Sequence, residues 1–336
     1  MLWVPVMSQY QPLNALVPTP NNSFQKGGKL ARRIVGGRRS LLRDVRLALT
    51  HALELPWIVF PLQPEEDSHP ELSPNSYPSY VDYLSVIAQM IVPTERKSVS
   101  YGTLAVLPTD YVWPEEKRHT KWFFINGICT SPAMALLETR EMAAAFQRPI
   151  HLIHSPTAGV VRDLWNAITA RTLRKDGRLS RPAFNIVKNA LLSHEKVVLT
   201  TYSQGTIVAS YIVRKILKDP ALRLHAHKLE VYCIGGAADS LHVDHALSAQ
   251  HGHSVPYVEH FANGKDFFAR VGVLAHYHDT SGAIFVIPDK KGHMLNSHYV
   301  KGIGRGDYCD QRSRLFKYAN GGEAGVNDYI PPDRRR

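Results

Sequence analysis

The sequence predicts an α/β fold in which a mostly parallel β-sheet carries helices on both faces, preceded by a helical and irregular N-terminal extension. From Lys121 onward, apolar runs of strand length alternate with segments of helical periodicity. This alternation is typical of βαβ units, whose parallel strands are buried on both faces. Apolar residues make up 44% of the 336 residues, which is enough to form a substantial core.

Residues 1–120 are interpreted as the basic N-terminal extension, which could pack on or cap the core. Residues 1–52 contain eight Lys or Arg residues and one acid, Asp44. Eight minus one gives +7 of the formal charge of +11, so the rest of the chain is close to neutral. This charge distribution indicates that any electrostatic attraction to an anionic partner arises mainly in the extension.

Two helices are expected within the extension. Apolar residues recur at helical spacing from Leu41 to Leu53, with arginines beside them, and this pattern predicts a basic amphipathic helix. Residues 63–79 have the composition of a loop, and residues 81–91 predict a second helix.

Two interpretations of residues 30–53 stay open. The basic amphipathic helix could contact an anionic membrane surface, or its apolar stripe could pack on the core while the arginines face water. Nucleic acid is the weaker hypothesis for a partner, because residues 26–46 lack aromatic side chains interleaved with the basic ones.

The α/β domain is expected to span residues 121–318 and to be followed by a disordered tail, 319–336. Six apolar runs predict its strands: 122–126, 150–154, 197–203, 229–236, 257–263 and 283–288. Helices are predicted at Pro132–Phe146, Val160–Thr172 and Thr206–Leu217.

The candidate nucleophile is Ser203, at the point where a predicted strand ends and a helix begins. A serine in such a strand–turn–helix elbow needs small residues two positions before and after it, because the turn is tight. Gly205 meets this requirement, whereas Thr201 is larger than the usual glycine. The alternative is an ordinary Ser–Gly turn that caps the next helix.

A serine hydroxyl becomes nucleophilic when a histidine takes its proton and an acid orients that histidine. Asp266, which follows the fifth predicted strand, is the preferred acid, and Asp239, which follows the fourth, is the alternative. His293, in the loop after the last strand, is the preferred base, and His298, five residues later, is the alternative. Either aspartate could instead be a helix cap.

Two backbone N–H groups should stabilise the negative charge that develops on the substrate oxygen. Gln204 follows the candidate nucleophile, and Ile128 follows Gly127 in the loop after the first predicted strand. A glycine at this point permits the conformation that turns an N–H group inward, although Asn126-Gly127 could simply form a turn.

From about Lys121 to Val300 the chain resembles the α/β-hydrolase superfamily. The segment Thr201–Gly205, TYSQG, is similar to the GYSQG elbow of cutinase-like and lipase-like esterases. The chain departs from the family pattern at Thr201 and at Asn126, where many relatives carry histidine before the glycine.

The resemblance implies a serine hydrolase that cleaves carboxylic esters of small molecules or lipids through an acyl-enzyme. The roles it implies are Ser203 as nucleophile, Asp266 as acid, His293 as base, and Gln204 and Ile128 as oxyanion-hole donors. An acyltransferase with the same triad and an inactive α/β-hydrolase-fold binding module are the alternatives.

Neither a metal nor an organic cofactor is expected. The three cysteines are far apart and form no CxxC motif, and the sequence contains no P-loop or GxGxxG motif. The chain also has no secretory signal pattern and no apolar run of membrane-spanning length. We therefore expect a cytoplasmic protein, peripheral to a membrane if the basic helix binds lipid.

Overall fold

The computed structural model of the protein describes residues 43, 45–61, 69–91, 103–106, 119–155, 180–243, 255–308 and 313–325. The chain divides into two units, Met1–Ser40 and Leu41–Arg336. Every described residue belongs to the second unit, and the sequence expectations for residues 30–42 and for Val160–Thr172 lie outside the described residues.

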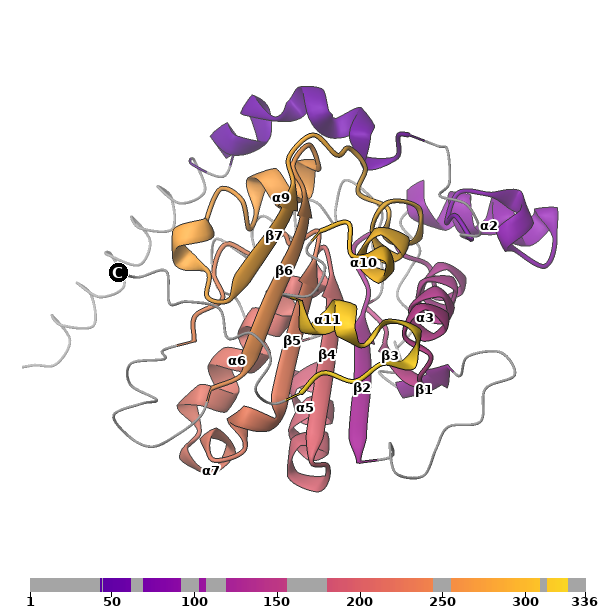
Figure 1. The fold of residues 1–336 in the computed structure, drawn as a ribbon. Coiled ribbons are helices and arrows are strands. Elements are labelled where there is room, and N and C mark those ends of the chain that lie inside the picture. The colour runs from indigo at the N-terminus through magenta and orange to yellow at the C-terminus, as the bar shows by residue number, and fades with distance from the viewer. Residues whose placement is uncertain are drawn as a thin grey trace, which may run out of the picture. The chain divides into compact units, whose positions relative to one another are not determined.

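A seven-stranded sheet forms the centre of this unit (Figure 1). The strands are β1 (Thr103–Val106), β2 (Thr120–Ile125), β3 (Ile150–Ile153), β4 (Lys196–Tyr202), β5 (Leu229–Ile234), β6 (Tyr257–Asn263) and β7 (Ala283–Ile287). Their spatial order is β1-β3-β2-β4-β5-β6-β7. β1 is antiparallel to β3, and every other neighbouring pair is parallel. The predicted α/β fold with a mostly parallel sheet is confirmed.

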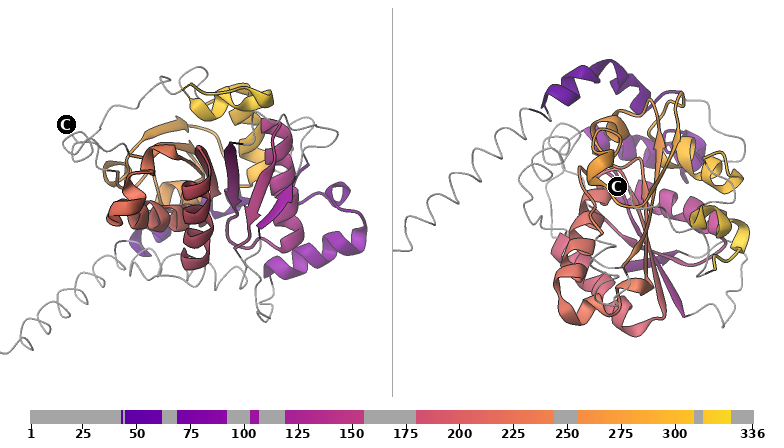
Figure 2. Two further views of the ribbon diagram at one scale, coloured as in Figure 1. Left: turned by 90° about the horizontal axis from the view of Figure 1, so that it is seen from below. Right: turned by 60° about the vertical axis from the view of Figure 1, so that its left-hand side comes forward.

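Helices cover both faces of the sheet (Figure 2). On one face, α5 (Ser180–Ser193) and α6 (Gly205–Lys218) pack against strand residues such as Phe123. On the other face, α3 (Pro132–Phe146) packs against residues such as Trp122. Successive strand residues point to opposite faces, so two covered faces require continuous apolar runs.

Several shorter elements complete the described fold. The remaining α-helices are α2 (Tyr80–Ile91), α7 (Pro220–Arg223), α9 (Phe267–Val271), α10 (Lys301–Arg305) and α11 (Arg314–Lys317). The 3₁₀ helices are η1 (Ala52–Ile58), η2 (Pro74–Ser76), η4 (Ala226–Lys228), η5 (Tyr277–Asp279) and η7 (Ala319–Gly321). The element η6 (Asn296–Val300) is a π-helical turn.

Helix α3 has the predicted bounds because both of its ends carry local signals. Ser131 accepts a hydrogen bond from the N–H of Met134, and Pro132 occupies the first helical position. Gln147 ends the helix in the left-handed conformation. Helix α5 was not predicted, although Ala183, Val187, Ala190 and Leu191 follow helical spacing and are buried.

The sheet begins before the expected domain boundary at residue 121. Strand β1, within the segment that we assigned to the extension, pairs with β3 along Thr103–Val106. This strand spans four residues at the edge of the sheet, too short a run to stand out in the sequence. The extension therefore contributes directly to the sheet.

Residues 69–77 are tied to the C-terminal half of the fold through Glu71. Its buried carboxylate accepts hydrogen bonds from the N–H groups of Asn296, at 2.6 Å, and Ser297, at 3.3 Å. The Ser297 hydroxyl donates a third, at 2.7 Å. Burial raises the pKa of Glu71, and these hydrogen bonds oppose that increase. Glu71 therefore caps the first turn of η6 from a distant part of the chain.

Residues 319–325, which we expected to belong to a disordered tail, are part of the fold. Ala324 is buried, and the guanidinium of Arg148 donates to the Gly322 carbonyl at 2.6 Å. The same guanidinium lies 4.7 Å from the centre of the Trp122 ring. The polar, glycine-rich composition of this segment gave no indication of these contacts in the sequence. Residues 326–336 lie outside the described part of the chain.

Residues 45–50 are helical, as predicted, and η1 continues this segment beside α9 (Figure 1). Leu47 and Ala48 pack on the core cluster that contains Phe268, whereas Leu49 and Leu53 are exposed. The apolar stripe is thus divided between the core and solvent. Among the residues that the structure describes, no helix has the length and apolar character needed to cross a membrane.

We predict that Glu71→Ala lowers the free energy of unfolding by about 3 kcal/mol, because two buried N–H groups and a hydroxyl lose their acceptor. Urea unfolding followed by circular dichroism at neutral pH measures this change. Glu195→Ala is the control, since that side chain is 79% exposed, and it should cost less than about 0.5 kcal/mol. Equal losses for the two variants would show that Glu71 is not an anchor.

Candidate active site

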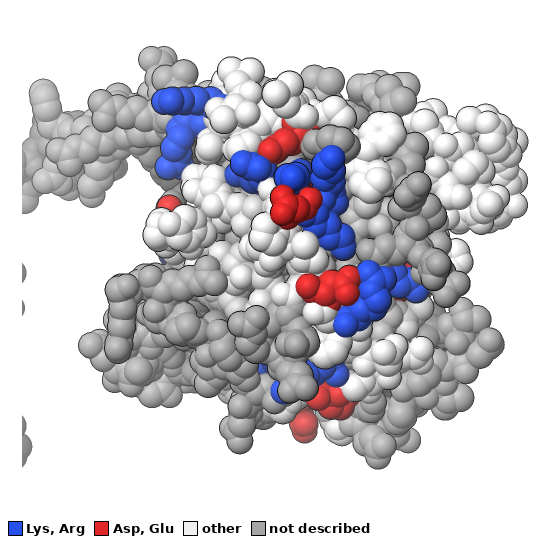
Figure 3. Space-filling model, turned by 45° about the horizontal axis from the view of Figure 1, so that its top comes forward, with Lys and Arg blue, Asp and Glu red and all other residues white. Residues whose placement is uncertain are grey.

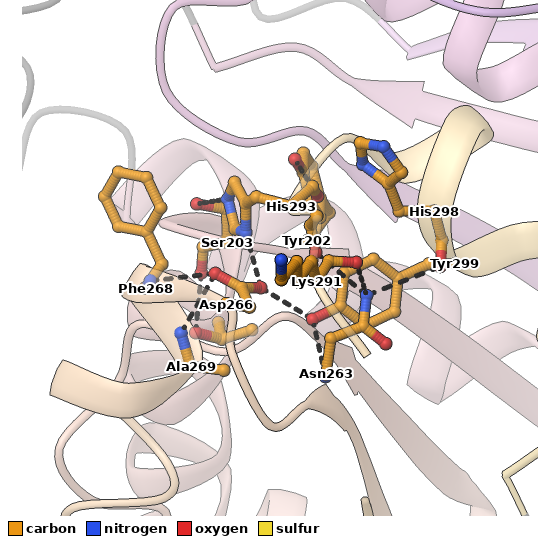
Figure 4. A network of polar contacts seen from close by, with 12 residues as sticks. Tyr202, Ser203, Asn263, Asp266, Phe268, Ala269, Lys291, His293, His298 and Tyr299 are labelled. Carbon is orange, nitrogen blue, oxygen red and sulfur yellow. Dashed lines mark hydrogen bonds and ion pairs between the residues drawn. The ribbon is translucent and has the colours of Figure 1, made fainter. Parts of the chain in front are cut away.

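Ser203 lies in the tight turn between β4 and α6, and its backbone is held in a strained conformation (Figure 4). Its φ angle is +51°, a region that non-glycine residues rarely adopt. The Ser203 N–H donates to the Ile234 carbonyl at 2.9 Å, and the Ser203 carbonyl accepts from the Thr206 hydroxyl at 2.7 Å. Strain that is held in place by surrounding hydrogen bonds is typical of functional sites.

Two glycines are required because other atoms of the chain come too close to them to leave room for a side chain. A Cβ atom at Gly205 would lie 2.6 Å from the Ile125 carbonyl oxygen, and one at Gly127 would lie 2.9 Å from the Ser203 Cβ. Thr201, the residue that departs from the elbow pattern, is buried, and its hydroxyl donates to the Tyr232 carbonyl at 3.3 Å. The larger side chain is therefore accommodated against β5.

The structure brings Ser203, His293 and Asp266 into one hydrogen-bonded chain (Figure 4). His293 Nε2 lies 3.0 Å from Ser203 Oγ, and His293 Nδ1 lies 2.7 Å from Asp266 Oδ2. If Nδ1 carries the proton that it donates to Asp266, Nε2 is free to accept the serine proton. The three side chains follow β4, β7 and β6 respectively, so they meet at the carboxyl edge of the parallel sheet.

Asp266 caps a helix and contacts His293 with the same carboxylate. Its Oδ1 accepts from the N–H groups of Phe268, at 2.8 Å, and Ala269, at 3.4 Å, at the start of α9. Its Oδ2 accepts from His293 and from the Tyr299 hydroxyl, the latter at 2.6 Å. The helix-cap and triad-acid interpretations of Asp266 are thus compatible.

Two aromatic rings lie on either side of His293. The Tyr202 ring centre is 4.9 Å and the Phe268 ring centre 4.5 Å from that of the imidazole. The Tyr202 hydroxyl donates to the His293 carbonyl at 2.7 Å, and the His293 N–H donates to the Ile58 carbonyl at 3.3 Å. The sequence interpretation did not single out Tyr202 or Phe268, although each lies within two residues of a candidate site residue.

The alternative acid and base lie elsewhere. His298 is in η6, and its Nε2 lies 2.8 Å from the Pro61 carbonyl. Burial lowers the pKa of His298, which favours the neutral ring that donates to this carbonyl. Asp239 is partly exposed and accepts a hydrogen bond from the Ser240 hydroxyl at 3.1 Å.

The two expected oxyanion donors belong to segments that meet at Ser203. Gln204 is the next residue and precedes α6, and Ile128 follows Gly127, which packs on Ser203. Within the described residues, neither the Gln204 N–H nor the Ile128 N–H has an acceptor. Their role as oxyanion donors stays a prediction.

The side chain of Asn126 sets the shape of the loop before Ile128. Its amide nitrogen donates to the carbonyls of Gly127, at 3.0 Å, and Ser155, at 2.9 Å. Its oxygen accepts from the Ser155 N–H at 2.6 Å. Asn126 thus links the segments that follow β2 and β3.

An apolar cluster, which we call the cover, lies against His293. It contains Phe267, Phe268 and Val271 of α9 together with Leu47, Ala48, Ile58, Ile128 and Ile207. Ser203 is 1% exposed, and His293 is 3% exposed. Within the described residues, no group of three or more His, Cys, Asp or Glu side chains is placed to hold a metal ion.

Comparison with known proteins adds little to this geometry. Neither a protein-family model nor a curated protein matches the sequence. The structure is similar to the crystal structure of a protein from Silicibacter sp. TM1040 described as a "putative thioesterase", with a TM-score of 0.35 and 13% identity. The match covers 62% of this chain and 80% of that one. At these values the likeness assigns no function to this chain.

We predict that Gly205→Ala destabilises the fold by about 3 kcal/mol, because the added Cβ meets a backbone carbonyl that cannot move away. Gly236→Ala is the control, since its Cβ would meet only ordinary contacts at 3.6 Å or more. It should cost less than about 1 kcal/mol in the same urea titration. Equal losses of unfolding free energy in the two variants would mean that the turn tolerates alanine at position 205.

Proposed function

We propose that the protein is a serine hydrolase of the α/β-hydrolase type, which cleaves carboxylic esters through an acyl-enzyme on Ser203. The observation that carries this proposal is the chain of hydrogen bonds from Ser203 through His293 to Asp266. The order of these residues along the sequence, serine then acid then histidine, is the order found in α/β-hydrolases. The strained φ angle of Ser203 in a strand–turn–helix elbow supports the same assignment.

In the proposed reaction, His293 Nε2 takes the proton of Ser203 as Oγ attacks the ester carbonyl carbon. The N–H groups of Gln204 and Ile128 stabilise the oxyanion that forms. Protonated His293 then gives its proton to the leaving alcohol, and the acyl group stays on Oγ. Water, activated by His293, releases the acid in a second step of the same kind. Asp266 keeps the Nδ1 proton in place and stabilises the imidazolium.

The substrate is proposed to be an ester of a small molecule or a lipid. An acyltransferase shares the whole first half of this reaction and differs only in the alcohol that replaces water. An inactive binding module is the alternative from another class. A fluorophosphonate probe separates it from an enzyme, because only an activated serine reacts rapidly.

We predict that Ser203→Ala lowers ester hydrolysis on the order of 10⁴-fold, because only binding and the oxyanion donors remain. Hydrolysis of a p-nitrophenyl ester and fluorophosphonate labelling with peptide mapping measure this loss. His293→Ala should be about as damaging, and Asp266→Asn should reduce turnover strongly, because the orienting acid fixes the imidazole tautomer.

His298→Ala and Asp239→Asn are the matched controls, and both should have milder effects. A reversed ranking in either pair would transfer the role to the other residue. Full activity in a folded Ser203→Ala protein would exclude the proposed mechanism.

We also propose that residues 30–53 contact an anionic membrane surface. Leu49 and Leu53 are 72% and 90% exposed, and Arg43 and Arg46 on the same segment are exposed as well. In Figure 3 small mixed groups of basic and acidic side chains lie in the middle of the face shown, and a separate group of basic side chains lies at its upper left. Because Leu47 and Ala48 pack on the core, only the outward residues are available for lipid.

We predict that the protein binds vesicles containing phosphatidylserine at low salt and is released at raised salt, since each nearby Lys or Arg adds about 1 kcal/mol of attraction. The double variant Leu49→Ser/Leu53→Ser should bind less in a vesicle sedimentation assay. Leu192→Ser, at a 50% exposed leucine of α5, should bind as the wild type does. A wild-type protein that ignores these vesicles at low salt would show that the segment is structural.

A further inference from the structure

We propose that Tyr299 is a positioning residue, whose hydroxyl holds the carboxylate of Asp266 against His293. Tyr299 Oη donates to Asp266 Oδ2 at 2.6 Å, and this same oxygen lies 2.7 Å from His293 Nδ1 (Figure 4). The inference rests on the proposed function, in which Asp266 orients His293. It adds to the triad a fourth side chain that does not touch substrate.

The direction of the hydrogen bond is fixed by the surroundings of the hydroxyl. Tyr299 Oη accepts a hydrogen bond from the Asn263 N–H at 3.0 Å, so its own proton is directed to Asp266. Burial and the neighbouring carboxylate raise the pKa of Tyr299 well above its ordinary value. The Tyr299 hydroxyl therefore stays protonated, and donates to Asp266, at the neutral and mildly alkaline pH at which ester hydrolysis would be measured.

The ring of Tyr299 is held on several sides. It is fully buried and lies parallel to the ring of Tyr308, with the ring centres 6.0 Å apart. It belongs to η6, a π-helical turn whose first N–H groups are bound by Glu71. Such turns are rare and occur frequently at functional sites. The hydroxyl can leave Asp266 only if this packing is disrupted.

The two oxygens of Asp266 are held differently. Oδ1 is held by the N–H groups of Phe268 and Ala269, which fix the position of the carboxyl group at the start of α9. Oδ2 is held by His293 and Tyr299 alone among the described residues. Without Tyr299, Oδ2 would lose the contact that keeps it in place while the imidazole gains and loses its proton.

The contact also weakens the negative field that the Asp266 carboxylate exerts on His293. A carboxylate that accepts a hydrogen bond is partly neutralised by the donor, so it attracts a nearby cation less strongly. Removal of the Tyr299 hydroxyl leaves a stronger negative field at His293. The imidazolium form of His293 is then favoured.

Other titratable groups in the vicinity cannot produce this effect. In the described residues, titratable groups that stack on or interact electrostatically with His293, Tyr202, His298 or Tyr299 include Cys129, Glu71, Glu138, Lys290 and Tyr308. Burial, followed by the neighbouring carboxylates, raises the pKa of Tyr202, which stays neutral. Burial lowers the pKa of His298, which also stays neutral. A single hydroxyl deletion at Tyr299 alters none of these charges directly.

Tyr299→Phe tests the proposal, because it keeps the ring and removes only the hydroxyl. We expect kcat per titrated active site to fall about tenfold with KM changed less than about twofold, since orientation and not substrate binding is lost. The acid limb of kcat/KM, which reports the protonation of His293, should move to higher pH. The NMR titration of His293 should move in the same direction.

Tyr308→Phe is the matched control. Its hydroxyl donates to Asn263 and its ring stacks on Tyr299, yet it does not contact Asp266. This variant should lose stability to a similar extent while keeping the wild-type kcat per titrated site and the wild-type titration of His293. Active-site titration with a fluorophosphonate removes the effect of any misfolded fraction.

The outcomes of these measurements decide between the hypotheses. If Tyr299→Phe matches Tyr308→Phe in both kcat per site and the His293 titration, Tyr299 is only a core residue and the proposal is wrong. If the wild type neither hydrolyses esters nor reacts with the probe, the proposed function fails. The NMR titration still tests the contact in that case, because it requires no turnover. A shift of the measured NMR titration curve of His293 to higher pH in Tyr299→Phe alone supports the proposal, whereas no shift or a shift to lower pH overturns it.

Discussion

The hydrogen bonds to the buried carboxylate of Asp266 are the interactions on which the rest of the site depends. A buried charge is costly unless it is fully hydrogen-bonded, and Asp266 accepts four hydrogen bonds. Its donors come from the start of α9, from the loop after β7 and from η6. One charge therefore fixes three segments relative to one another, and the position of the imidazole follows from that arrangement.

The sheet supplies the second constraint. Parallel neighbours all end at one edge, so side chains that follow β4, β6 and β7 converge although they are up to 90 residues apart in the sequence. The strain at Ser203 is balanced by hydrogen bonds from its own backbone to β5 and to α6. The rigid part of the fold thus holds the serine, and the less regular elements hold the acid and the histidine.

Most features with a local pattern could be predicted from the sequence, α5 being the exception, and features that depend on distant partners could not. Six strands were predicted because burial on both faces requires continuous apolar runs. Glu71 gave no signal, because its partners lie 225 and 226 residues away and an isolated acid in a polar loop is ordinary. Tyr299 resembles any core tyrosine until Asp266 is placed beside it. Asp266 and Asp239 both follow strands, and only the three-dimensional positions distinguish them.

The cover over His293 has a consequence for how the site would select its reactants. Ser203 is almost completely buried, and the His293 N–H is bound to a carbonyl of η1. If the proposed function holds, a molecule that reacts at Ser203 Oγ would need the side chains around it to move, and the observed rate would be the intrinsic rate of the opened form multiplied by the fraction of molecules that are open. A small electrophile needs a smaller displacement than a bulky ester. Discrimination by molecular size would then depend on the residues of the cover, in α9 as well as in the N-terminal segment, while the chemical step stays the same for every reactant.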